Sequence, residues 1–196
     1  ARLQEWKQKH ATVTDFILRA YQADIVMAAE AFGTEPSVLG GVNVKNFMAT
    51  DDFVLANGEY MFNQGVIMNG DLAGVSDVNP DLIAEDVSHA WYSADAPQHP
   101  YDGTTIPNYT GFVERDTVYG KLPTLDGDGK YSWVKSPRYQ GEPVEVGPLA
   151  CLLVSYARGN KVVVDSVNGL LARTGLPVAA LFTTLGRTAA RMLQTV

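Results

Sequence analysis

The sequence predicts a mainly α-helical fold, a bundle of long helices with irregular excursions rich in aromatic residues, proline and glycine, and little β structure. Three observations predict it. Apolar residues recur every three or four positions near both ends of the chain, and only short turns separate the last helical segments. The helical period disappears between residues 33 and 78, and residues 33–147 form irregular excursions with one helix near residues 81–92. We interpret residues 1–196 as a single segment of a larger helical domain.

Length and composition set the first limits on function. With 196 residues, 46% of them hydrophobic, the chain can build one core. Its net charge of −7 argues against a nucleic-acid partner, because no lysine and arginine stripe neutralises phosphates. No apolar run reaches the roughly 20 residues that span a bilayer, and the three histidines lack metal-ligand spacing. The single cysteine, Cys151, excludes an internal disulfide and is expected to be a buried small hydrophobe.

Residues 1–32 are predicted to form one long helix with an apolar stripe. The stripe consists of Leu3, Trp6, His10, Val13, Ile17, Tyr21, Ile25 and Ala28. It should face other helices, so we expect His10 to be a satisfied core histidine rather than a metal ligand. Gly33 and Pro36 should end the helix. Because this helix has no N-cap residue and the last helix has no C-cap, we interpret the chain as an internal piece of a longer polypeptide.

Between residues 33 and 78, glycine-rich turns replace the helical period. Residues 60–62 and 66–68 are short strand candidates joined by a turn. The glycines could also cradle a phosphate, but neither Gly-x-x-x-x-Gly-Lys-Ser/Thr nor Gly-x-Gly-x-x-Gly occurs, which makes that function a weak alternative. We expect a compact, irregular segment with little sheet.

Asn79 and Pro80 are predicted to begin a second helix over about residues 81–92, with Asn79 as its cap. Its buried side should consist of Leu82, Ile83, Val87 and Trp91. On such a helix Glu85 and Asp86 point about a quarter-turn apart and do not form a facing carboxylate pair. Glu85 is then most simply a solvated helix charge.

Residues 91–112 combine aromatic side chains with proline and glycine, a composition that cannot be helical and that can fasten a loop onto a core. An aromatic sugar-binding module is an alternative function, ranked lower because no well-placed pair of carboxylates accompanies it. The Asp-Gly-Asp-Gly sequence at residues 126–129 lacks the other ligands of a calcium loop and is expected to be a surface turn.

Residues 130–150 place ionisable groups among aromatics and prolines, which predicts a stiff, buried crossing. Lys135, Arg138 and Glu145 must then find partners, because an unpaired buried charge is very costly. A structural loop with a surface ion pair is the alternative. Helical segments with short turns between them follow, which makes them antiparallel neighbours in a bundle. They cover residues 148–158, 162–173 and 179–196.

Four ordered motifs carry a resemblance to a known family. Residues 130–150 read KYSWVKSPRYQGEPVEVGPLA, which resembles the central region of the large subunit of nickel-iron hydrogenases. The other motifs are NGEY leading to GVI, HAWY leading through HP to GTT, and TGLP leading to TLGRTAAR; they start at residues 57, 89 and 174. The resemblance covers essentially the whole chain and is closest to the periplasmic or membrane-associated uptake type.

The resemblance implies a subunit that holds a nickel-iron centre, with carbon monoxide and cyanide on the iron, and a magnesium site. Such a subunit splits or makes molecular hydrogen and passes electrons to iron-sulfur clusters in a small subunit. The family's nickel ligands are four cysteines in two Cys-x-x-Cys motifs, one near each end of the full subunit, and neither motif is present here. The resemblance therefore implies that this segment holds no catalytic residue and no direct metal ligand, and is inactive alone.

The resemblance implies that this segment positions groups around a metal centre whose ligands lie elsewhere in the subunit. Lys135 and Glu85 are the two main candidates to hold the water and carboxylate network beside the magnesium site, with Arg138 and Glu145 behind them. For each residue the alternative is a structural ion pair. For the chain, the alternative is a non-catalytic scaffold or assembly fragment of the same family.

Overall fold

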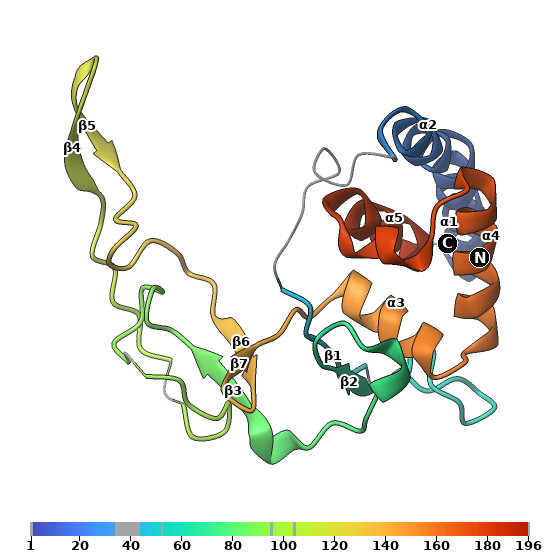
Figure 1. Cartoon of the computed structure of the whole chain (residues 1–196), viewed down its shortest axis with the longest axis horizontal. Helices are drawn as coiled ribbons and strands as arrows, with labels where there is room; N and C mark the ends of the chain where they lie inside the picture. Colours follow the sequence, from blue (N-terminus) through green and yellow to red (C-terminus); the bar gives the residue numbers. More distant parts are fainter. Residues whose placement is uncertain (1, 34–43, 52, 95, 104, 196) are drawn as a thin grey trace. The chain divides into compact units, whose positions relative to one another are not determined.

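The computed structural model describes residues 2–33, 44–51, 53–94, 96–103 and 105–195 (Figure 1). Its helices are α1 (Arg2–Phe16), the π-helix η1 (Ile17–Tyr21), α2 (Gln22–Phe32), the 3-10 helices η2 (Leu72–Gly74) and η3 (Pro80–Leu82), α3 (Pro148–Ala157), α4 (Lys161–Thr174), the 3-10 helix η4 (Val178–Phe182) and α5 (Thr184–Thr195). Its strands are β1 (Phe47–Ala49), β2 (Gly65–Ile67), β3 (Ile83–Asp86), β4 (Val113–Thr117), β5 (Gly120–Thr124), β6 (Ser136–Tyr139) and β7 (Glu142–Pro143).

The predicted fold class is wrong. The described residues are 43% helical and 20% strand, and they contain three small antiparallel sheets: β1-β2, β3-β6-β7 and β4-β5. It is a mixture of helices and sheets rather than a long-helix bundle with little β structure. The strands are too short for their apolar residues to show a period of two. Strand β3 also pairs with β6, some fifty residues further along the chain, and a local sequence pattern does not show such a pairing.

Two compact units make up the chain. The helical unit comprises residues 1–78 and 145–196, and the strand unit comprises residues 79–144. That the whole chain is one segment of a larger helical domain stays a prediction. No described helix combines the length and the apolar character that a membrane crossing requires.

The core of the helical unit forms where α3 packs beside β1 and β2 (Figure 1). Phe47, Ile67 and Leu153 are fully buried there. The predicted helices at 148–158 and 162–173 are confirmed as α3 and α4, and the third is divided into η4 and α5. Helix α4 has clear end signals: the Asn160 side chain accepts a hydrogen bond from the backbone N–H of Val163, and Gly175 ends it in the left-handed conformation at φ 68°.

The long first helix is confirmed, since α1, η1 and α2 follow one another without a break. Its stripe is only half packed, however. Ile17 and Ile25 are buried, but α1 has no buried residue. His10 is exposed and stacks on Trp6, with 5.0 Å between ring centroids, so the prediction of a core histidine is wrong. The expected stop at Pro36 lies outside the described residues.

The predicted helix over residues 81–92 is wrong. Asn79 does cap, with its side chain accepting a hydrogen bond from the Asp81 N–H at 3.1 Å, but only the single turn η3 follows. The chain then extends as β3, because β6 offers a hydrogen-bonding ladder that overrides the local helical pattern. Similarly, the predicted strand at 66–68 is confirmed as β2, whereas residues 60–62 form no strand; β2 pairs instead with β1, which sequence reasoning missed.

The strand unit is assembled around aromatic rings, as the composition of residues 91–112 predicts. Trp91 is buried, and its ring makes edge contacts with Tyr109 and Trp133 at centroid distances of 4.9 and 5.1 Å. The Lys130 ammonium donates to the carbonyl oxygens of three residues at 3.3–3.4 Å: Val87, Ser88 and Ala94. Hairpin β4–β5 is almost entirely exposed.

Candidate functional site

Lys135 and Glu85, the two main candidates from the sequence, form an ion pair in the strand unit. Lys135 Nζ lies 2.5 Å from Glu85 Oε2, and the side chains are 27% and 32% exposed. The ammonium also lies 5.7 Å from the centroid of the Tyr92 ring, within reach of a cation–π interaction. A hollow beside the pair is lined by both residues together with Val87, Tyr92, Gln98 and Thr105. The predicted need of Lys135 for a partner is confirmed.

Arg138 forms a second ion pair, with Asp86. Its Nη2 donates to Asp86 Oδ2 at 2.8 Å, while Nη1 donates to Ser136 Oγ at 2.5 Å. Asp86 also accepts the backbone N–H of Ser88 at 2.9 Å. This backbone hydrogen bond is the main reason that the pKa of Asp86 is lowered; the Arg138 charge contributes in the same direction, and burial opposes both. Sequence reasoning missed Asp86 as a partner, although the charge of Arg138 required one.

The two ion pairs lie on opposite faces of the same ladder. In the β3–β6 register, Glu85 is opposite Pro137 and Asp86 is opposite Ser136. Successive residues of a strand point to opposite faces, so Lys135 shares a face with Glu85, and Arg138 shares the other face with Asp86. On a helix the Glu85 and Asp86 side chains would point about a quarter-turn apart. On strand β3 they point to opposite faces instead.

Glu145 lies in the helical unit, where it binds Arg187 of α5. Arg187 Nε is 2.9 Å from each carboxylate oxygen, and Nη2 also contacts Oε2. Nη1 donates to the carbonyl oxygens of Phe182 and Thr183 at 2.7 and 3.2 Å. The Glu145 N–H donates to Asn46 O at 2.8 Å, so this carboxylate ties the segment before β1 to the start of α5. Sequence reasoning quoted Arg187 in a motif but missed its role.

The predicted burial of residues 130–150 is only partly right. Tyr139 and Val144 are buried, as are Leu149 and Ala150, but Val134 is 74% exposed. The charged groups are therefore half-buried beside solvent. That position suits residues that hold water or carboxylates in place.

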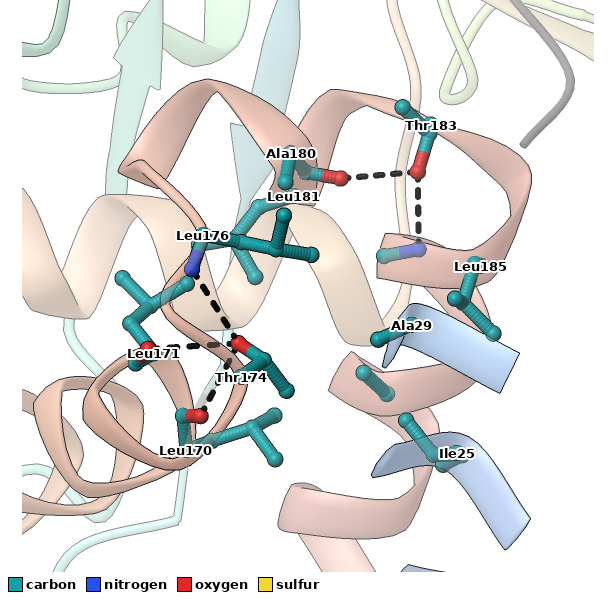
Figure 2. Close-up of a pocket in the computed structure, with 12 residues that line it drawn as sticks. Ile25, Ala29, Leu170, Leu171, Thr174, Leu176, Ala180, Leu181, Thr183 and Leu185 are labelled. Atoms are coloured by element: carbon teal, nitrogen blue, oxygen red, sulfur yellow. Dashed lines mark hydrogen bonds between the residues drawn. The ribbon is translucent and has the colours of Figure 1, made fainter. Parts of the chain in front are cut away.

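An apolar cavity lies in the helical unit, between α2, α4, η4 and α5 (Figure 2). Its only side-chain polar groups are two threonine hydroxyls. Thr174 Oγ1 donates to the Leu170 or Leu171 carbonyl at 3.2 Å, and Thr183 Oγ1 donates to Ala180 O at 2.7 Å and accepts from the Gly186 N–H at 3.1 Å. The cavity thus offers nothing to orient a polar ligand.

The side chains described here do not fit the nickel-iron centre that the resemblance implies. Such a centre needs several thiolates, and Cys151 is the only cysteine. Burial, with the nearby Asp51 carboxylate, raises the pKa of its thiol. The side chain packs against the apolar core but is only partly buried, so the predicted buried position is only partly right. Among the described residues, no three His, Cys, Asp or Glu side chains are grouped closely enough to hold a metal ion.

Comparison with known proteins covers the whole chain. Residues 1–196 match the model of a family described as nickel-dependent hydrogenase. The quinone-reactive Ni/Fe-hydrogenase large chain of Wolinella succinogenes is 51% identical over 99% of this chain and 34% of its own. The uptake hydrogenase large subunit of Rhizobium leguminosarum bv. viciae is 38% identical over 92% of this chain and 32% of its own. The chain therefore spans about a third of the length of these relatives.

Solved structures show the same architecture. The reduced Ni-Fe-Se hydrogenase of D. vulgaris Hildenborough matches with a TM-score of 0.62 and 25% identity, over 98% of this chain and 37% of that chain. A reduced, active form of the enzyme from Desulfomicrobium baculatum matches with a TM-score of 0.64 at 24% identity, over the same shares of the two chains. The second likeness bears on the fold alone.

Proposed function

We propose a function from one premise: this chain belongs to the nickel-dependent hydrogenase family. It forms the central part of the large subunit of a nickel-iron hydrogenase that, when complete, reversibly oxidises molecular hydrogen. Electrons then pass to iron-sulfur clusters of a small subunit, in the periplasm or at a membrane reached through partners. The match of all 196 residues to the family carries this proposal.

The nickel-iron centre with its carbon monoxide and cyanide ligands, and the magnesium ion, belong to the complete subunit and supply the hydrogen chemistry there. This segment alone is inactive because it lacks the four thiolates. Its own contribution is to hold charges in fixed positions. The β3–β6 ladder fixes Lys135 and Glu85 beside a hollow, where they hold the water and carboxylate network near the magnesium.

Arg138 and Glu145 contribute one step further away. Arg138 with Asp86 stabilises the opposite face of the same ladder and so keeps the register that brings Lys135 to Glu85. Glu145 fixes the first turn of α5 through Arg187. Both are positioning residues in this proposal.

Substitution of Lys135 in the full-length heterodimer tests the assignment. Lys135→Ala should lower hydrogen uptake with an artificial electron acceptor by about 10- to 100-fold, the usual cost of removing a group that supports a metal site. Folded yield and nickel content should stay unchanged. Lys121→Ala, on the exposed strand β5, is the matched control and should keep full activity. Loss of folded protein with Lys135→Ala, rather than of activity, would show that the ion pair is structural.

Metal content separates the enzyme from the scaffold alternative. The isolated 196 residues should bind no stoichiometric nickel, since one thiol with a raised pKa cannot replace four thiolates. The full-length subunit, matured with its partner, should contain one nickel by elemental analysis. A folded full-length heterodimer without nickel or activity would favour a scaffold, and one nickel on the isolated segment would contradict the ligand assignment.

A further inference from the structure

The apolar stripe of the first helix is buried only in its second half. Towards α2, Ile17 and Ile25 are 8% and 4% exposed, and the next buried residue is Ala29, at 4%, rather than the predicted Ala28. Towards the start of α1, Leu3, Trp6 and Val13 are 63%, 59% and 54% exposed, and His10 lies exposed between them. The opposite side of α1 is polar, with residues Glu5, Gln8, Thr12 and Asp15. Helix α1 is thus weakly amphipathic, since the exposed Phe16 lies outside the stripe, and the apolar side has no partner among the described residues.

The π-helix η1 keeps the two halves of the stripe in phase. Residues 17, 21, 25 and 29 are spaced by four, and in an α-helix each such step rotates the side chain by about 40° beyond a full turn. The wider turn of η1 (Ile17–Tyr21) absorbs this drift. As a result, the exposed stripe of α1 is the direct continuation of the side that α2 packs against α4 and α5.

Helix α5 runs antiparallel to this stripe and points towards its exposed half. Ile25 and Ala29 line the apolar cavity together with Leu185 and Ala189, and Figure 2 shows Ala29 and Ile25 on the side of Leu185. Tyr21 Oη donates to Thr188 O at 3.4 Å. Ile17 belongs with Met192 to the same buried cluster, but neither lines the cavity. As α5 proceeds from 185 to 192, its neighbours therefore run from residue 29 back to residue 17.

We propose that the exposed stripe Leu3, Trp6, His10 and Val13 is covered in the full-length subunit by a helical continuation of α5, formed by the residues that follow residue 196. The relatives are about three times as long as this chain, so about two thirds of their length lies outside the matched segment. The stripe from Leu3 to Val13 is about 15 Å long, which about ten further helical residues would cover. The proposal rests on the proposed function in one respect, that the chain is part of a full-length large subunit.

The proposal also fixes the pattern of the covering segment. Leu185, Ala189, Met192 and Val196 are apolar at intervals of four, three and four. The continuation must keep that phase, with apolar residues at about positions 199 or 200, 203, and 206 or 207, and without an early proline. A proline or a run of charges on that face directly after residue 196 would overturn it.

Photo-crosslinking in the full-length heterodimer tests the contact itself. The photoreactive amino acid p-benzoyl-phenylalanine replaces Trp6, and cross-linked peptides are mapped by mass spectrometry after irradiation. Cross-links should fall within about 15 residues after residue 196. The same probe at Gln8, on the polar side, should not reach that segment. The probe at Tyr21 is the positive control and should cross-link to α5.

Every other result at position 6 overturns the proposal. Cross-links to the small subunit, to a second copy or to a distant part of the large subunit identify a different occupant. Absence of cross-links, when the Tyr21 probe reacts, means that the stripe stays uncovered. Hydrogen uptake and nickel content are measured on the same samples. An active heterodimer with wrong cross-links refutes only the docking, and correct cross-links in a nickel-free, inactive heterodimer refute only the proposed function.

Discussion

Different interactions stabilise the helical unit and the strand unit, each within itself. In the helical unit, large side chains such as Phe47, Leu153 and Met192 are fully buried, so most of its stability comes from apolar burial. In the strand unit the buried apolar residues are few: Val87, Ala90, Trp91, Tyr139 and Val144. Aromatic edge contacts, ion pairs and the hydrogen bonds of the Lys130 ammonium add to the stability of this unit.

This difference shows how a protein can place charges precisely without a large core. Lys135, Glu85, Arg138 and Asp86 are positioned by a short backbone ladder, and they stay half-buried beside solvent. Substitution of side chains in that setting should cost less stability than substitution in the apolar core, but its cost should depend on pH. Four variants examine the contrast, in order of decreasing expected effect.

Leu153→Ala should have the largest effect, because it opens a cavity in the apolar core. The expected loss is about 3 kcal/mol of unfolding free energy. Denaturant unfolding measures it, with Leu125→Ala as the control, since Leu125 is 51% exposed and should cost less than about 0.5 kcal/mol. Equal losses for the two variants would contradict the assignment of the core.

Arg187→Met examines the ion pair between Glu145 and α5 in the helical unit. It leaves the half-buried Glu145 carboxylate without its bidentate partner, so about 2 kcal/mol should be lost. Arg187→Lys keeps the charge but not the fork geometry and should recover only part of this. The double variant with Glu145→Gln should cost clearly less than the sum of the single variants in unfolding measurements; strict additivity would argue against the contact.

Lys130→Met should loosen the strand unit only. It keeps an apolar stem but removes the donors to three carbonyl groups, for a loss of about 1 kcal/mol. Amide exchange in residues 87–94 should then accelerate roughly fivefold, while exchange in α3 stays unchanged. Lys121→Met on exposed β5 is the control. Equal acceleration in α3 would mean that the two units unfold together and would break the comparison.

Asp86→Asn should have the smallest effect, about 0.5 kcal/mol at pH 7, and that effect should depend on pH. Because folding lowers the pKa of Asp86, its contribution is complete above the ordinary value of 3.8 and is lost as pH falls through the folded value. The stability difference from the unmodified protein should therefore shrink in acid, below about pH 3.8. Asp128→Asn, whose side chain is 95% exposed, is the control variant in the same unfolding series.

Helices α3 and α4 were predictable because they carry their own end signals. Pro148 begins α3, Asn160 caps α4 and Gly175 ends it, and all of these act within one turn. Strand β2 was predicted, but β1 and β3 were not, since they depend on partners elsewhere in the chain. Residues 81–92 had a helical apolar pattern, and a distant ladder overrode it.

The candidate site was predictable in its cations but not in all its partners. Charge among aromatics and prolines marked Lys135, Arg138 and Glu145, and Glu85 was chosen separately; the structure joins it to Lys135. Asp86 and Arg187 were missed because a demand for a counter-charge does not say which carboxylate or guanidinium meets it. His10 failed for the opposite reason: an apolar stripe shows which side can be buried, but not whether a partner is at hand.

The alternation of Glu85 and Asp86 against Lys135 and Arg138 has a consequence for the fidelity of strand pairing. If β3 slipped by one residue along β6, Glu85 would move to the face of Arg138 and Asp86 to that of Lys135, and both encounters would still join opposite charges. The pattern of charges is therefore compatible with both registers and does not by itself disfavour the shifted one. A slip would, however, displace β3 relative to Tyr139, which is buried and whose hydroxyl accepts the Asn79 N–H at 3.1 Å. The contacts of Tyr139 thus depend on a register that the two ion pairs alone do not define.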